Sequence, residues 1–142
     1  MDYSETYDFI KYEKEYLIRE SYMDTLGHMN NASYIRLLEE ARWDLIEERG
    51  YGLKTVMSEK ISPIVLEINI KFSREILNRD TIKVQTQVSE YRGKVGNIRQ
   101  QIFKEGELAC TADFKFGLFD LKSRKLINAT DKWLNAIGQK RQ

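Results

Sequence analysis

The sequence predicts an α+β fold in which a curved antiparallel sheet wraps around one long helix. Residues 33–49 carry apolar side chains at helical spacing. From residue 66 onward, four segments alternate between apolar and polar residues, as half-buried strands do. Short turns separate these segments and therefore indicate antiparallel neighbours, because parallel strands need long crossovers. A single long helix is then available to cover the apolar face of the sheet.

Length and composition set the first limits. The chain has 142 residues, which predicts one domain over residues 1–142. Hydrophobic residues make up 42% and charged residues 32%, a globular composition. The net charge of +1 argues against a dedicated nucleic-acid or membrane-surface binder. No apolar run approaches the ~20 residues of a membrane helix, and residues 1–5 are polar, so we expect a cytoplasmic protein.

The elements are expected in the following order. Residues 15–23 form the first strand, and residues 33–49 form the long helix, which Gly50 and Gly52 end. The candidates for the helix cap are Asn30, Asn31 and Ser33. After Pro63, the alternating strands cover residues 66–73, 82–88, 95–103 and 108–118, with turns at 91–94, 105–106 and 122–124. A short strand and a helix over 130–137 complete the chain.

Residues 24–34 lead directly into the long helix and read Asp-Thr-Leu-Gly-His-Met-Asn-Asn-Ala-Ser-Tyr. This order puts one carboxylate, Asp24, beside a helix N-terminus. Free N–H groups and the positive end of the helix dipole favour negative charge at such a place, including an oxygen that becomes negative during a reaction. A carboxylate beside such a hole suggests acyl-transfer chemistry.

The chain resembles a hotdog-fold acyl-CoA thioesterase of the 4-hydroxybenzoyl-CoA thioesterase type. The resemblance covers roughly residues 13–127. Its carriers are Asp-x-x-Gly-His-x-Asn-Asn at 24–31, the Ala-Ser-Tyr that follows, Leu-Glu-Glu-Ala-Arg at 38–42 and Ile-Lys-Phe-Ser-Arg-Glu at 70–75. Relatives often have a second acid two residues before the catalytic one, where this chain has Tyr22.

The resemblance implies an acyl-CoA or acyl-carrier-protein thioesterase that forms a homodimer or homotetramer, with active sites between subunits and no metal or redox cofactor. It implies that Asp24 is the catalytic carboxylate, acting either as nucleophile or as the base that activates water. It also implies that the backbone N–H of Asn31 is an oxyanion donor. The alternative for Asp24 is a turn cap, and for Asn31 a helix cap.

Further residues are candidates for substrate binding. They are Gly27, His28 and Asn30 in the motif, Tyr34 and Glu39 on the helix, and Arg92 and Lys94 near a hairpin. His28 is the only histidine, and we expect it to shape the loop or contact substrate rather than act as a base. Tyr34 either lines an acyl pocket or belongs to the core.

Charged residues on the helix and the hairpin leave two alternatives each. Glu39 and Arg42 are three residues apart and are expected to form an ion pair, with Glu39 as a base being the alternative. Arg92, Lys94 and Arg99 either hold the phosphates of a nucleotide-bearing thiol or are solvated.

The lone cysteine and histidine exclude two kinds of site. Cys110 has no second cysteine with which to form a disulfide, and one cysteine with one histidine cannot build a standard zinc cluster. Cys110 alternates in phase with Ala112 and Phe114 and is predicted to be a small buried residue. Two functions besides hydrolysis remain open: a non-catalytic acyl-thioester binding module, and a hotdog-fold hydratase or dehydratase.

Overall fold

The computed structural model describes residues 8–25 and 27–140. The polar residues 1–5 and Leu26 of the Asp24 segment lie outside the described residues. In chain order the elements are β1 (Tyr12–Leu17), a 3-10 turn (Glu20–Tyr22), α1 (Asn31–Glu48), α2 (Leu53–Glu59), β2 (Ile61–Phe72), β3 (Thr81–Arg92), β4 (Val95–Lys104), β5 (Glu107–Asp120), β6 (Lys125–Ile127) and α3 (Asp131–Ala136). Within the described residues, no helix is long and apolar enough to cross a membrane.

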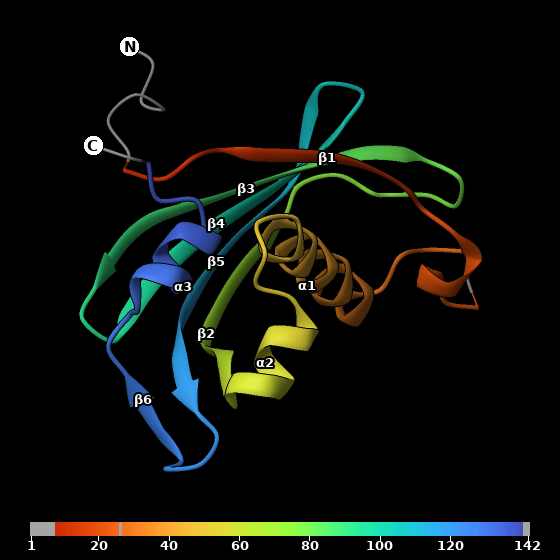
Figure 1. Ribbon diagram of the computed structural model, residues 1–142. Coiled ribbons are helices and arrows are strands. Elements are labelled where there is room, and N and C mark those ends of the chain that lie inside the picture. Colours follow the sequence, from red (N-terminus) through yellow and green to blue (C-terminus); the bar gives the residue numbers. More distant parts are fainter. Residues whose placement is uncertain (1–7, 26, 141–142) are drawn as a thin grey trace.

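The strands form one antiparallel sheet in the order β1-β3-β4-β5-β2, with β6 paired to the end of β5. The sheet curves around α1, which lies on its inner face (Figure 1). The alternation predicted this face: Ile82, Val84, Thr86 and Val88 on β3 are all buried. The predicted α+β fold, with a curved antiparallel sheet around a central helix, is confirmed.

Helix α1 begins and ends close to the predicted residues. Asn30 is the cap, because its Oδ1 accepts a hydrogen bond from the N–H of Ser33 at 3.0 Å. Gly50 has φ +86°, the left-handed conformation that commonly follows a helix. The buried face of α1 consists of Ser33, Tyr34, Leu37, Leu38, Ala41, Leu45 and Ile46. These side chains are covered by the inner face of the sheet, which holds the site residues in place.

Two predictions at the start and middle of the chain were wrong. The first strand is Tyr12–Leu17, not residues 15–23, because after Leu17 the chain leaves the sheet and Glu20–Tyr22 forms a 3-10 turn. The helix α2 was missed, since its seven residues are too few to show a helical period.

Strand β2 starts earlier than predicted, at Ile61, and includes Pro63. Proline is tolerated there because β2 is an edge strand, paired only with β5. A β-bulge between Val65 and Glu67 takes Leu66 out of the predicted face, while Ile68, Ile70 and Phe72 keep it. Along this edge, four large apolar side chains are 38 to 46% exposed: Val65, Leu66, Ile68 and Phe72.

Candidate active site at the start of the central helix

The segment that contains Asp24 folds back on itself immediately before α1. Met23 and Met29 form an isolated antiparallel bridge. The backbone N–H of Asp24 donates to the carbonyl oxygen of His28 at 2.8 Å, and the N–H of Gly27 donates to the carbonyl oxygen of Asp24 at 3.1 Å. Gly27 has φ +78°, which glycine adopts without a steric penalty. The motif therefore forms a closed loop ahead of the helix.

Asp24 is half-buried in this loop. Its Oδ1 accepts a hydrogen bond from the backbone N–H of His28 at 3.1 Å. The capping role of Asp24 is thus present in the structure. An asparagine would keep this acceptor and remove only the charge.

His28 joins the loop to the segment after β2. It forms an isolated bridge with Leu77, and its Nδ1 is paired with Oε1 of Glu75. The two paired side chains are 58% and 51% exposed. Sequence reasoning missed Glu75 as a site residue, because no local spacing links it to His28 and only the tertiary fold brings the two segments together.

The first turn of α1 presents backbone N–H groups next to this loop. The side chain of the cap residue Asn30 accepts a hydrogen bond from the N–H of Ser33. The backbone carbonyl oxygen of Asn30 accepts another from the N–H of Tyr34 at 3.3 Å. Asn31 is exposed as the first residue of the helix, and its backbone N–H has no acceptor among the described residues. A free N–H at a helix N-terminus is suited to an anion or a polarised carbonyl oxygen.

A shallow pocket of about 360 Å³ adjoins the helix start. Asn31, Tyr34, Phe72 and Glu75 are among its walls. Tyr34 is buried and packs edge-on against Phe72, with ring centroids 4.8 Å apart. Tyr34 therefore belongs to the core and also borders the site.

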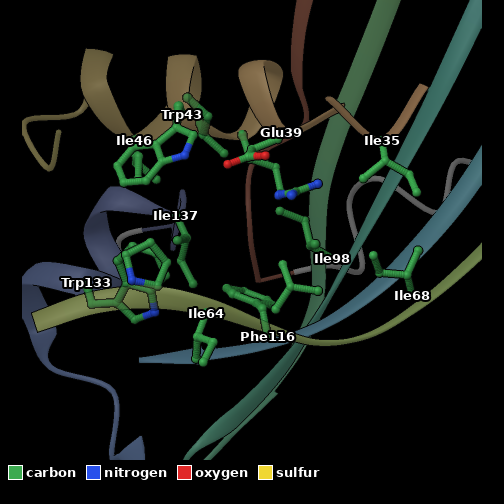
Figure 2. Close-up of a pocket in the computed structure, with 14 residues that line it drawn as sticks. Ile35, Glu39, Trp43, Ile46, Ile64, Ile68, Ile98, Phe116, Trp133 and Ile137 are labelled. Carbon is green, nitrogen blue, oxygen red and sulfur yellow. The ribbon is translucent and has the colours of Figure 1, made fainter. Parts of the chain in front are cut away.

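A second pocket of about 400 Å³ lies further along α1, between the helix and the inner face of the sheet. It is lined mainly by apolar side chains, and this apolar pocket is drawn in Figure 2. Ile35 and Ile68 lie at one end of it, Ile46 and Trp133 lie at the other, and Glu39 projects from α1 between them. Ile35 follows Tyr34 directly, so the shallow pocket and the apolar pocket are neighbours along the helix.

The expected ion pair between Glu39 and Arg42 is wrong: no salt bridge joins them in the described structure. Arg42 instead donates through Nη1 to Oε1 of Gln100 at 2.8 Å, and its guanidinium lies 4.2 Å from the ring centroid of Phe114. Burial lowers the pKa of Arg42 to about 10, and the charge of Glu39 opposes this shift. The sheet supplied a partner for Arg42 that helical spacing could not predict.

The structure does not bring the basic hairpin to Asp24 within one chain. Arg92 and Lys94 are exposed at the turn between β3 and β4. This turn lies at the opposite end of β3 from the loop of Asp24 (Figure 1). The 12 residues of β3 separate them by roughly 35 Å at ~3.3 Å per residue. Arg99 is engaged elsewhere, in two hydrogen bonds to Asp113 at 3.0 and 3.1 Å.

Cys110 is buried on β5, as predicted. Burial raises the pKa of its thiol to about 11. A thiol in this state is protonated near neutral pH and is a small apolar residue rather than a nucleophile.

Comparisons with known proteins find similar chains. The pattern of the thioesterase-like superfamily matches residues 18–137. The long-chain acyl-CoA thioesterase FadM of Escherichia coli is 32% identical over 112 residues, which are 78% of this chain and 84% of FadM.

Solved structures show the same fold. The probable thioesterase YbaW of Escherichia coli superposes with a TM-score of 0.76 at 29% identity, covering 89% of this chain and 96% of YbaW. The DHNA-CoA thioesterase of Staphylococcus aureus superposes with a TM-score of 0.79 at 25% identity, covering 89% of this chain and 87% of that one. The expected hotdog fold is thereby confirmed.

Proposed function

The chain belongs to the thioesterase-like superfamily, and from this we propose that it hydrolyses an acyl-CoA thioester to a free acid and CoA, using the loop of Asp24 and the first turn of α1. The observation that carries the proposal is that the half-buried Asp24 lies in the loop directly before a helix N-terminus whose first N–H has no acceptor among the described residues. Relatives named as acyl-CoA thioesterases supply the substrate class.

In the proposed reaction, the thioester carbonyl oxygen accepts a hydrogen bond from the backbone N–H of Asn31. This donor stabilises the negative charge that develops when the carbonyl is attacked. In one route Asp24 attacks the carbonyl carbon, the C–S bond breaks to release CoA as its thiolate, and water then hydrolyses the acyl-Asp24 anhydride to the free acid. In the other route Asp24 takes a proton from the attacking water and returns it to the sulfur as the C–S bond breaks. A thiol leaves readily, so one carboxylate and one anion hole are sufficient groups for this chemistry.

The acyl chain is proposed to run from Asn31 past Tyr34 and Ile35 into the apolar pocket. Asn31, Ile35, Arg42 and Ile46 are spaced by four, seven and four residues, so they share one side of α1. Of these residues, Asn31 lines the shallow pocket, and the other three line the apolar pocket.

The substitution Asp24→Asn tests the role of the carboxylate. It keeps the acceptor for His28 and is expected to lower kcat by roughly a hundredfold or more, the usual contribution of a general base. Release of CoA thiol from a panel of acyl-CoA and acyl-carrier-protein thioesters is the measurement.

Asp120→Asn is the matched control, because Asp120 also caps a turn, accepting from the N–H of Lys122 at 2.9 Å. Near-normal rates in Asp24→Asn would refute the assigned role. Binding of acyl-CoA without thiol release would identify a binding module instead. A changed acyl chain on an intact thioester would identify a hydratase or dehydratase.

A homodimer through strand β2 is also proposed. The two edges of the sheet differ in how many large apolar side chains they expose. Strand β1 exposes one, Leu17, beside three charged residues, whereas β2 exposes four, Val65, Leu66, Ile68 and Phe72, beside Glu67 and Lys71. Charged edge residues prevent strand pairing, and an exposed apolar edge favours it. A second copy paired antiparallel along β2 would cover this edge.

This dimer would also give the basic hairpin a role. Antiparallel pairing along β2 would reverse the direction of the partner's sheet, and would bring the end of that sheet that carries Arg92 and Lys94 toward Asp24 of the first protomer. The phosphates of CoA would then be bound in trans.

Subunit complementation tests this arrangement. Asp24→Asn is mixed and refolded with the double variant Arg92→Glu and Lys94→Glu, each having low activity alone. Recovered activity in the mixture is expected for sites shared between subunits, because one site of each mixed dimer is intact. No recovery in mixed dimers, or a monomer in light scattering, would contradict the shared site.

A further inference from the structure

Two charged side chains are among those that line the apolar pocket. Of the 14 residues that line it, only Glu39 and Arg42 carry charge. Burying a guanidinium without full pairing is unfavourable, so a purely hydrocarbon ligand does not account for Arg42 at this place.

Arg42 has hydrogen-bond donors left for a ligand. A guanidinium has five N–H donors, and in the described structure one nitrogen, Nη1, bonds to protein, at Gln100. One face of the guanidinium is covered by Phe114. Among the described residues, every fully buried side-chain nitrogen has a hydrogen-bond partner, so the remaining nitrogens of Arg42 are not sealed inside the protein. Arg42 is also one of the residues that line this pocket.

Glu39 supplies acceptors next to these donors. Its carboxylate projects from α1 between the two ends of the pocket (Figure 2). It is close enough to Arg42 to affect the pKa of the guanidinium, but no salt bridge joins the two. The wall therefore presents a donor and an acceptor side by side.

We propose that the apolar pocket binds an acyl chain that carries a hydroxyl group, which accepts a hydrogen bond from Arg42 and donates one to Glu39. The inference rests on the proposed thioesterase function and names its substrate class. A hydroxyl group matches both side chains because it donates and accepts. A carboxylate at the same place is attracted by Arg42 but repelled by Glu39, and it loses its hydration on entering a mainly apolar pocket. A methyl group forms no hydrogen bond with either side chain.

The position of the hydroxyl follows from the helix. Arg42 is eleven residues after Asn31, which is roughly 16 Å along the axis at ~1.5 Å per residue. Side chains on a helix lean toward its N-terminus, which shortens the distance to the guanidinium. At ~1.2 Å per bond of extended chain, the hydroxyl lies on the order of ten bonds from the thioester carbonyl.

The test compares dodecanoyl-CoA, ω-hydroxydodecanoyl-CoA and the ω-carboxy analogue as substrates. Wild type is expected to show a kcat/KM about tenfold higher for the hydroxy substrate than for dodecanoyl-CoA, mainly through KM, and the lowest value for the carboxy substrate. Arg42→Met is expected to remove this preference or reverse it. The preference is a ratio within one enzyme, so a partly unfolded variant still reports it.

Arg36→Met is the matched control, because Arg36 is on α1 but does not line the apolar pocket. Equal or better cleavage of dodecanoyl-CoA by wild type would overturn the inference and leave the proposed function intact, as would an unchanged preference in Arg42→Met. If wild type cleaves none of the three, the proposed function fails. Calorimetric titration of Asp24→Asn with the same three thioesters then measures their affinities, and shows directly whether the pocket prefers the hydroxy chain.

Discussion

The backbone N–H of His28 donates to Oδ1 of Asp24 at 3.1 Å, while the side chain of the same histidine pairs with Glu75. One residue therefore connects the candidate catalytic carboxylate to the segment that follows β2. The loop of Asp24 depends on groups far apart in the sequence, and this dependence can be tested at each group separately.

Glu75→Gln is expected to lower kcat by roughly three- to tenfold and leave KM nearly unchanged, because His28 loses its charged partner and Asp24 is held less firmly. Steady-state kinetics with one acyl-CoA is the measurement. Glu107→Gln is the control, because Glu107 pairs with Arg74, the neighbour of Glu75, and does not touch His28. Equal losses in both variants would show that Glu75 has only a structural role.

A comparison of Gly27→Ala with Gly106→Ala distinguishes an effect of the loop conformation on activity from a general loss of stability. Gly27 and Gly106 both have φ +78°, and a Cβ at either would meet no atom within 4 Å. Alanine should therefore lower the free energy of unfolding by about 1 kcal/mol at both positions, from backbone strain alone. Urea unfolding checks the stability, and only Gly27→Ala is expected to lower kcat. Equal activity in the two variants would argue against a catalytic role for the loop.

Gln100→Leu is expected to destabilise the protein by about 2 to 3 kcal/mol. Gln100 is fully buried beneath α1, where its Nε2 bonds to the carbonyl oxygen of Leu38 and to Oγ1 of Thr86, both at 3.0 Å. Leucine leaves these groups and Arg42 without their partner. The neighbouring Gln101→Leu should change stability by less than ~0.5 kcal/mol, since Gln101 is half-exposed on the other face of the sheet. Similar chemical denaturation midpoints for both variants would contradict this account.

Tyr22→Phe is expected to destabilise the protein by about 1 kcal/mol near pH 8, because the hydroxyl of Tyr22 donates to Oε2 of Glu40 at 2.5 Å. Burial, together with Glu40, raises the pKa of Tyr22 to about 12, whereas an unfolded tyrosine ionises near pH ~10. The folded pKa is the higher one, so this stabilisation is complete below the unfolded pKa and is lost as the pH rises toward the folded pKa.

The stability difference between wild type and Tyr22→Phe should therefore shrink above a pH of about 10. Urea unfolding of both proteins at about pH 8 and about pH 11 measures it. A difference that grows with pH would mean that Glu40 does not hold the neutral hydroxyl of Tyr22.

The order of the elements other than α2, and the loop before the long helix, could be predicted from the sequence, because both depend on local patterns. The long helix, its cap at Asn30, the left-handed Gly50 and four of the strands follow from periodicity and turn residues. Helix α2 and the start of β2 could not be predicted, since seven residues and a proline give no clear period.

By itself, the sequence determined that one carboxylate stands before the N-terminus of one long helix, because chain neighbours remain neighbours in any fold. Only the tertiary structure decided which distant groups meet there. In the folded protein His28 pairs with Glu75, and Arg42 donates a hydrogen bond to Gln100 instead of pairing with Glu39. Arg92 lies at the far end of the sheet from Asp24. The physical reason is that strand register and the packing of α1 on the sheet set these contacts, and neither follows from spacing along the chain.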